Sequence, residues 1–214
     1  MSFETRCALG LQWDNEVSTQ LELQGYIIGR YNIENAAPHY KAHPNYPDAE
    51  NPSIKLVRYF PDGIATDFKK DVAFFWDAKN GGSIEKHAYE TYYEIGNNGR
   101  ELYLFIKSSF GTFCVPINEI VFLNSLEYVS GFPSSKQMPV NSDGWIAPRE
   151  WPPEKYISWK YKYPNASGTP FKYFDFKNMQ KWKFDWPFDY SNVRAIVESN
   201  WWKIIPNQTQ QRLS

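Results

Sequence analysis

The chain has 214 residues, enough for one large domain or for a domain with an extension, and enough to bury a substantial core. Its formal net charge of −1 excludes a global basic field that would attract nucleic acid, and its two cysteines exclude a disulfide-rich scaffold. Neither an N-terminal signal segment nor an apolar run of membrane-spanning length is visible, so we expect a soluble, intracellular, cytoplasmic protein with no membrane partner.

The first predicted element is a helix over residues 12–29. Asp14 or Asn15 is a suitable N-cap residue, and Gly25 is a suitable stop at the C-terminal end. Residues 26–31 then predict a short strand.

Residues 32–53 are rich in Pro, Asn and Ala and show no periodicity, which predicts a long loop. His39 and His43 have the spacing of a metal-binding pair on a helix, but the prolines around them argue against a helix. A zinc site also needs further ligands, and no cysteine is nearby. Contact with a substrate, or a plain surface position, is therefore favoured for both histidines.

Residues 56–79 form the stretch around which the rest of the chain is organised. Residues 56–60 and 63–66 predict strand structure that is interrupted at Pro61 and Asp62, residues 67–70 predict a turn, and residues 72–76 predict a strand buried on both faces. That last strand runs directly into Asp77, Ala78 and Lys79.

The charges of Asp77 and Lys79 are unexpected at the end of a buried strand, because burying a charge is costly unless it is paired or binds a metal. Opposed strands would bring Asp62 and Asp77 close together, and two neighbouring carboxylates repel unless a cation lies between them. A hard divalent ion such as Mg²⁺ would resolve the conflict. Residues i and i+2 of a strand share a face, so Lys79 would join Asp77 while Ala78 points away.

Beyond this stretch, Ser83 is a candidate N-cap for a helix over residues 84–95. Residues 101–107 and 110–117 predict two further strands, with Cys114 as a buried thiol, and residues 118–124 predict a short helix or strand. An α/β core of ordinary size results.

The composition changes from about residue 128 onward. Residues 149–183 carry eight Lys or Arg against three acidic residues, a local charge of about +5, interleaved with aromatic rings. Such alternation suits phosphate contacts and base stacking, with Lys155, Trp159, Lys160 and Lys162 as candidate nucleic-acid-binding residues. An aromatic mini-core with solvated lysines is the alternative. Residues 190–202 are a candidate closing helix, and the tail from Pro206 is expected to be mobile.

Pro61-Asp62, fourteen residues, and then Asp77-Ala78-Lys79 resembles the signature of the PD-(D/E)xK, or restriction-endonuclease-like, nuclease superfamily. The order of the predicted elements over residues 10–125 is similar as well. The resemblance implies an α/β fold with a mixed central β-sheet flanked by helices. Residues 1–127 would form the nuclease core, and residues 128–214 an aromatic-rich and lysine-rich extension packed on it.

The resemblance also implies an activity, hydrolysis of DNA phosphodiester bonds. Asp62, Asp77 and the Ala78 carbonyl would bind Mg²⁺, with Mn²⁺ as a possible substitute, and Lys79 would orient the attacking water or steady the phosphate charge. Glu16 would complete the metal shell, with Asp14 and Glu22 as rivals. A homodimer is possible, because cutting two strands needs two sites.

Two other classes of function stay open at the level of sequence. One is a non-catalytic binding or structural protein, such as a viral or assembly component, that uses its aromatic C-terminal region. The other is a zinc hydrolase built on His39, His43 and a carboxylate.

Overall fold

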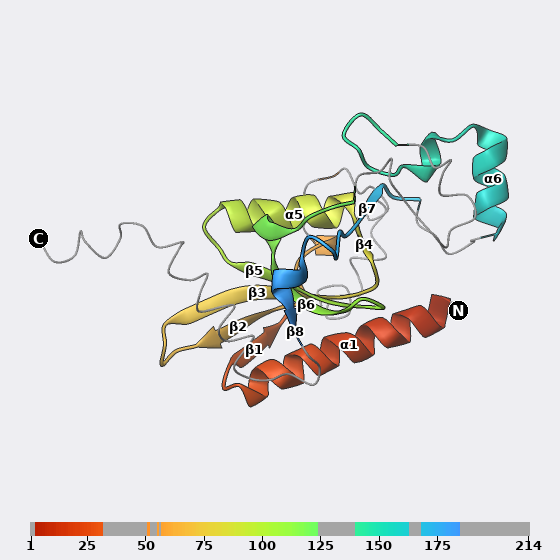
Figure 1. Cartoon of the computed structure of the whole chain (residues 1–214). Helices are drawn as coiled ribbons and strands as arrows, with labels where there is room; N and C mark the ends of the chain where they lie inside the picture. Colours follow the sequence, from red (N-terminus) through yellow and green to blue (C-terminus); the bar gives the residue numbers. More distant parts are fainter. Residues whose placement is uncertain are drawn as a thin grey trace, which may run out of the picture.

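The computed structural model describes residues 3–31, 51, 55, 57–123, 140–162 and 168–184; of residues 3–7, 159 and 162 it describes only the backbone. The protein is a mixed α/β structure with a central six-stranded sheet (Figure 1). Its helices and strands, in chain order, are α1 (Phe3–Leu23), β1 (Ile27–Arg30), β2 (Gly63–Asp67), β3 (Val72–Asn80), β4 (Ser83–Glu85), α5 (Lys86–Asn97), β5 (Leu102–Ser108), β6 (Gly111–Pro116), α6 (Pro153–Lys162), β7 (Phe171–Tyr173) and β8 (Lys183–Phe184).

The central sheet has the strand order β1-β2-β3-β5-β6-β8. Neighbouring strands are antiparallel except β3 and β5, which are parallel and are connected through β4 and α5. A parallel pair needs such a crossover, whereas the antiparallel pairs β2–β3 and β5–β6 are joined by short turns. Strands β4 and β7 form a separate two-stranded sheet.

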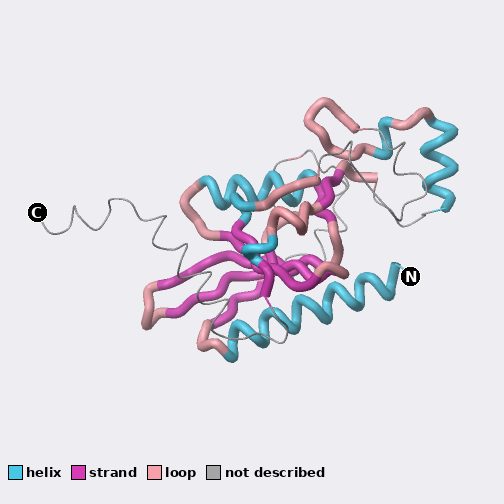
Figure 2. Tube along the Cα trace, viewed as in Figure 1, coloured by secondary structure: helices cyan, strands magenta, loops and turns pink. Residues whose placement is uncertain are grey.

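Helices α1 and α5 cover opposite faces of the central sheet, with the strands between them (Figure 2). Trp13, Val17 and Leu21 bury one stripe of α1 at the i, i+4 spacing of a helix. Trp13 also donates a hydrogen bond from Nε1 to the Phe105 carbonyl, 2.8 Å away, which fastens α1 to β5. Ala88 and Tyr92 anchor α5 on the other face.

Gly63, at the start of β2, is required by a close approach between strands. A Cβ at this position would lie 2.6 Å from the Gly29 carbonyl oxygen and 2.8 Å from Nε1 of Trp76. Any larger residue would therefore push β2 away from β1, or displace Trp76 from the core. The glycine that the sequence places after Asp62 thus serves packing as well as the turn.

Three local predictions are wrong. Helix α1 begins at Phe3 rather than near residue 12, so Asp14 and Asn15 lie inside it and cap nothing. Its first part contains no proline, and apart from Gly10 its residues are compatible with a helix. The segment before Pro61 is a helical turn instead of a strand, since the Tyr59 amide donates to the Lys55 carbonyl four residues earlier.

Ser83 is not a helix cap, because it begins β4 and pairs with Tyr173 of β7. The helix starts at Lys86, and Glu85 occupies the N-cap position without a side-chain hydrogen bond. A partner strand almost ninety residues downstream overrides the local capping signal, which no window of sequence around Ser83 can reveal.

Several other predictions are confirmed, and some fall on residues that the structure does not describe. Strands β3, β5 and β6 occupy the predicted segments, and Cys114 is fully buried. His39, His43, the predicted helix over residues 190–202 and the proposed boundary between residues 127 and 128 lie outside the described residues.

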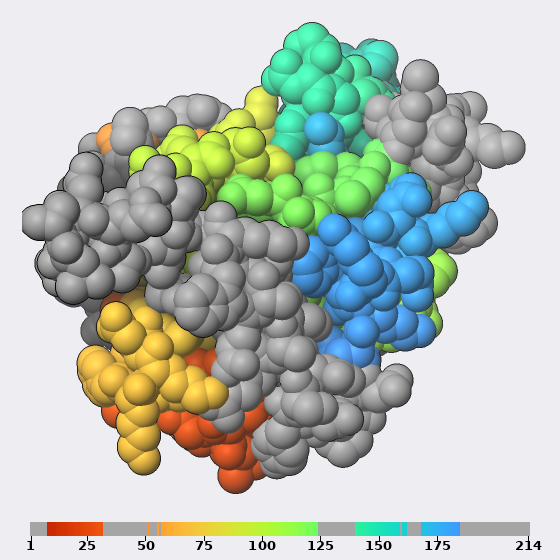
Figure 3. Space-filling model, turned by 60° about the vertical axis from the view of Figure 1, so that its left-hand side comes forward, coloured from red at the N-terminus to blue at the C-terminus, as the bar shows by residue number. Residues whose placement is uncertain are grey.

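The described C-terminal segment contributes to both sheets, because β7 pairs with β4 and β8 pairs with β6. In Figure 3 the blue surface of residues 168–184 adjoins the green surface that includes β5 and β6. Among the described helices, none is both long enough and apolar enough to cross a membrane.

Candidate functional site

Two aspartates and a lysine meet where β2 begins and β3 ends. Gly63 of β2 pairs with Trp76 of β3, so Asp62 falls opposite Asp77 at the next antiparallel step. The Ala78 amide donates to Oδ2 of Asp62 over 2.8 Å, which fixes that carboxyl against β3. The structure thus brings together Asp62, Asp77 and Lys79, which the sequence placed at adjacent strand ends.

Asp77 is the buried centre of this group, with 1% of its surface exposed. Its Oδ2 lies 2.6 Å from Nζ of Lys79, and its Oδ1 accepts a 2.6 Å hydrogen bond from the Tyr92 hydroxyl of α5. Lys79 in turn donates to the same hydroxyl over 3.3 Å. Both side chains therefore point to the α5 face, while Ala78 packs against the α1 face, as the alternation of a strand requires.

The electrostatics of the site favour an additional cation. Burial raises the pKa of Asp62 to about 8, with the Asp77 charge as the next cause and Lys79 and the Ala78 amide opposing them. Burial alone would lower the pKa of Lys79, but the charges of Asp77 and Asp62 outweigh it and raise that pKa. One ammonium is therefore insufficient to keep both carboxyls ionised near neutral pH.

Helix α1 contributes a third carboxyl, that of Asp14. Burial raises its pKa, Arg30 lowers it, and the charge of Asp77 raises it further. Arg30 Nη2 lies 3.5 Å from Oδ1 of Asp14, and this buried oxygen has no hydrogen-bond partner. Asp14 also acts on Asp62, so it interacts electrostatically with both strand aspartates.

Glu16, the first choice from the sequence, is held differently. Its carboxylate binds Nζ of Lys107 at 3.0 Å and accepts a 2.8 Å hydrogen bond from Gln12. Of the three acidic candidates on α1, Asp14 is the one whose charge acts on Asp62, Asp77 and Lys79. The sequence favoured Glu16, but it could not decide between the three, because their distances from the site depend on how α1 lies across the sheet.

Asp62, Asp77 and Lys79 line a cavity of about 380 Å³, whereas Asp14 and Glu16 do not belong to its lining. Tyr92 also lines this cavity, and the sequence did not single it out; the available signal is that a buried tyrosine hydroxyl needs a polar partner. Arg58, whose guanidinium lies 5.4 Å from the Tyr59 ring, and Glu85, whose charge acts on Lys79, also line it. The complete lining is Arg58, Tyr59, Phe60, Asp62, Asp77, Lys79, Ser83, Ile84, Glu85, Ala88 and Tyr92.

A metal ion fits part of this arrangement. Within residues 3–31, 51, 55, 57–123, 140–162 and 168–184, no group of three or more His, Cys, Asp or Glu is positioned to hold a metal. The features that suit a hard cation are the proton-retaining carboxyl of Asp62 beside Asp77 and the buried oxygen of Asp14, which forms an ion pair with Arg30 but accepts no hydrogen bond. Oxygen donors of this kind suit Mg²⁺ or Mn²⁺ better than zinc.

The predicted nucleic-acid-binding residues lie on helix α6, at the periphery of the molecule in Figure 1. Lys155 is exposed, and its ammonium lies 4.9 Å from the Trp151 ring. Lys160 is half-buried. The side chains of Trp159 and Lys162 are outside the described part of the structure.

No protein-family model matches the chain, and a search of the curated proteins finds no match.

Proposed function

We propose that the protein is a Mg²⁺-dependent endonuclease that hydrolyses DNA phosphodiester bonds through a site of the PD-(D/E)xK type. The observation that carries the proposal is the meeting of Asp62, Asp77 and Lys79 in one cavity, with the pKa of Asp62 raised to about 8. The motif lies in the meander β1–β3, which follows α1 and is followed by α5 and β5. Apart from the short strand β4, this order of helix, three strands, helix and strand resembles that of the superfamily. Perturbed carboxyls in a cavity are a physical mark of functional sites.

In the proposed site, Asp62, Asp77 and the Ala78 carbonyl hold the metal ion, and the carboxylate from α1 is that of Asp14 rather than Glu16. Bound Mg²⁺ supplies Lewis-acid polarisation of the scissile phosphate and lowers the pKa of a bound water. The proton on Asp62 leaves when the ion binds, because the carboxyl must be ionised to act as a ligand.

Lys79 and Tyr92 act on the geometry of the reaction. Lys79 places a positive charge where the phosphate would develop negative charge, and its i+2 position keeps it beside Asp77. Tyr92 is a positioning residue: its hydroxyl fixes the rotamer of Asp77 through the 2.6 Å hydrogen bond. Arg58, at the rim of the same cavity, supplies a further cation for the DNA backbone.

In this proposal, the aromatic C-terminal extension binds the DNA. Lys155 and Lys160 of α6, together with Trp159 and Lys162, would contact phosphates and bases. We infer a homodimer only for duplex cleavage, since one site cuts one strand.

The test is cleavage of supercoiled, linear and branched DNA in Mg²⁺ or Mn²⁺ by the wild type and by Asp77→Asn and Lys79→Ala variants. Loss of activity on the order of 10²–10³-fold in both variants is the expected result. Lys69→Ala is the matched control, because Lys69 is an exposed lysine on the turn between β2 and β3, at the far end of β3.

Tyr92→Phe removes the hydroxyl and keeps the ring. We expect a rise of about tenfold or more in the Mg²⁺ concentration that gives half-maximal cleavage, with a smaller effect at saturating Mg²⁺. A folded wild type that leaves every substrate intact in both metals would overturn the nuclease proposal.

A second candidate function has one observation in its favour. Lys79 already neutralises Asp77 at 2.6 Å, as in an ordinary structural ion pair. Under this alternative the protein is a non-catalytic binding or structural component, and its aromatic C-terminal region meets the partner. Thermal stability separates the two: a structural pair predicts no stabilisation by Mg²⁺, whereas a metal site predicts a higher melting temperature.

A further inference from the structure

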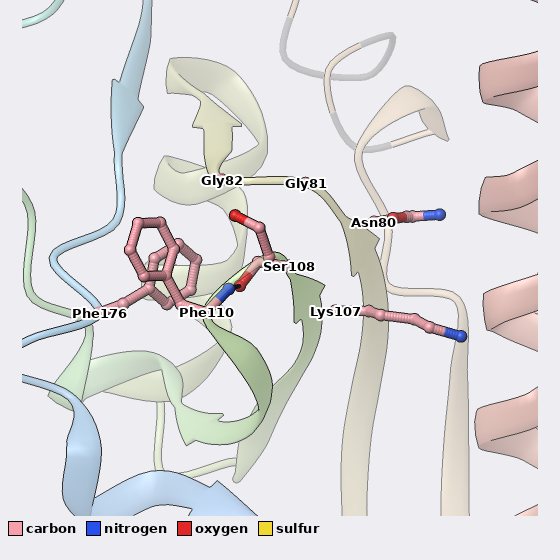
Figure 4. Close-up of a pocket in the computed structure, with 8 residues that line it drawn as sticks. Asn80, Gly81, Gly82, Lys107, Ser108, Phe110 and Phe176 are labelled. Carbon is pink, nitrogen blue, oxygen red and sulfur yellow. Dashed lines mark hydrogen bonds between the residues drawn. The ribbon is translucent and has the colours of Figure 1, made fainter. Parts of the chain in front are cut away.

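A second cavity, of about 390 Å³, is lined by Asn80, the last residue of β3, and by the residues that follow it. It is lined by Asn80, Gly81, Gly82, Lys107, Ser108, Ser109, Phe110 and Phe176. Figure 4 shows the rings of Phe110 and Phe176 side by side, with Ser108 next to them and the backbone of Gly81 and Gly82 nearby. Asn80 and Lys107 point away from the two rings.

The exposed ring of Phe110 is the unusual feature of this cavity. Its side chain is 63% exposed, although it stacks on Phe176 with the ring centroids 5.2 Å apart and an angle of 24° between the planes. Phe176 is itself buried and packs against Phe113 of the core. A ring that is held from beneath and open above is a platform for a further flat group.

The turn between β5 and β6 holds this platform in place. The Ser108 hydroxyl donates to the Gly111 carbonyl and accepts a hydrogen bond from the Phe110 amide, both over 3.2 Å. Gly111 takes a φ of 121°, which a residue with a side chain would rarely adopt. Two local hydrogen bonds and a glycine thus fix an otherwise exposed turn, so Phe110 is presented with little loss of entropy on binding.

The cavity is continuous with the candidate active site along the chain. Lys79 and Ser83 line the active-site cavity, and the residues between them, 80–82, line the second one. Gly81 carries no side chain, and a Cβ there would meet nothing within 4 Å. A DNA strand that lies over Lys79 would therefore meet no side chain at Gly81.

Of the two lysines near the β5–β6 turn, one is available to the platform. Lys183 of β8 lies against Gly111, where an added Cβ would meet its side chain. Lys107 is bound to Glu16, and its ammonium also lies 4.9 Å from the Trp13 ring. Lys183 thus places a positive charge, available to a phosphate, beside the turn that carries Phe110.

We propose that this second cavity binds an unpaired nucleotide of the DNA strand, with its base stacked on Phe110. The inference deepens the proposed function and rests on it for the identity of the strand. Bases inside a duplex have both faces covered by their neighbours, so only an unpaired base can use the platform. The preferred ligand is accordingly single-stranded or branched DNA rather than blunt duplex.

The test measures binding without cleavage. A fluorescent single-stranded oligonucleotide of roughly ten nucleotides, within the usual site size for such proteins, is titrated in EDTA and followed by anisotropy. A blunt duplex of the same sequence is the comparison. The wild type is expected to bind the single strand more tightly, and Phe110→Ala to weaken it by roughly 5- to 150-fold, the range for one stacked base.

Two variants control the result. Phe110→Trp keeps a stacking surface and should restore tight binding. Phe68→Ala removes an aromatic ring that is 78% exposed on the β2–β3 turn, at the far end of β3, and should change nothing. Equal affinity of wild type and Phe110→Ala, or a preference for blunt duplex, would overturn the inference.

The outcome is separate from the fate of the nuclease proposal. Asp77→Asn should lose cleavage and keep single-strand binding, because the platform does not use that carboxylate. If binding depends on Phe110 but no substrate is cut, the binding site stands and the catalytic proposal fails. If cleavage occurs while Phe110 has no effect on binding, only the inference about the cavity fails.

Discussion

At the scale of single residues, the carboxyl of Asp62 is the most informative group in the protein. It is half-buried beside a second carboxylate and accepts a hydrogen bond from the Ala78 amide, and its pKa is raised to about 8. The folded protein therefore binds a proton that the unfolded chain releases at a pKa of about 3.9. Such a group makes the stability of the metal-free protein depend on pH.

The change to test is Asp62→Asn in the absence of divalent cations. The proton on Asp62 stabilises the wild type fully below about pH 4, and this contribution is lost as the pH rises toward 8. The asparagine side chain of the variant does not titrate, so its stability lacks this dependence on pH. The melting temperature of the variant minus that of the wild type should therefore increase by several degrees between pH 5 and pH 8, at about 2–4 °C per kcal/mol.

Scanning calorimetry at the two pH values measures this difference directly. A difference that is the same at pH 5 and pH 8 would show that the pKa of Asp62 is not raised. Addition of Mg²⁺ at pH 8 should stabilise the wild type and leave Asp62→Asn nearly unchanged, since binding requires the ionised carboxyl.

At the scale of elements, the contact between α1 and β5 decides where the carboxylates of the helix lie. Trp13 fills the core on that face, and its indole Nε1 donates to the Phe105 carbonyl over 2.8 Å. Asp14 follows Trp13 directly, so the residue whose charge acts on Asp62 and Asp77 is adjacent to the residue that anchors the helix. Packing and the candidate site are thus coupled through adjacent residues.

Trp13→Phe should destabilise the protein by about 1–3 kcal/mol, because the smaller ring leaves space and the Phe105 carbonyl loses its donor. Urea unfolding followed by circular dichroism measures this loss. Leu23→Ala, at an exposed position near the end of the same helix, is the control and should change stability little. Equal stability of Trp13→Phe and wild type would mean that the indole hydrogen bond does not anchor α1.

At the scale of the whole molecule, the two halves of the chain share one core. Phe174, Phe176, Met179 and Trp182 pack among the side chains of α5, β5 and β6. Strand β8 also completes the edge of the central sheet beside β6. The boundary predicted between residues 127 and 128 therefore separates segments that bury each other's apolar surface.

A chain truncated after residue 127 tests that boundary. We expect it to lose cooperative thermal unfolding and to bind the dye ANS, because the apolar surface around Phe113 and Val115 loses its cover. Calorimetry and dye fluorescence, with the full-length chain as the reference, provide the measurement. A truncated chain that unfolds in a single cooperative transition would instead support residues 1–127 as an independent core.

The sequence by itself predicted the strands β2, β3, β5 and β6 and the helix α5, because their apolar runs and turn residues are local signals. It also predicted that Asp62, Asp77 and Lys79 would meet, since the alternation of β3 and an antiparallel partner depend on spacing alone. The predicted start of α1 was wrong, because no proline ends the helix before residue 12. The predicted strand before Pro61 was wrong, because helix and strand signals compete in short apolar segments.

Only the tertiary structure decided which further groups join that site. Tyr92 comes from the middle of α5 and Glu85 from the end of β4, while the charge of Asp14 acts on the site from α1. The pairing of β4 with β7 and of β6 with β8 likewise joins segments 70 to 90 residues apart. The reason is physical: burial, and the pKa shifts that follow from it, depend on neighbours in space, whereas periodicity and turn chemistry depend on neighbours in sequence.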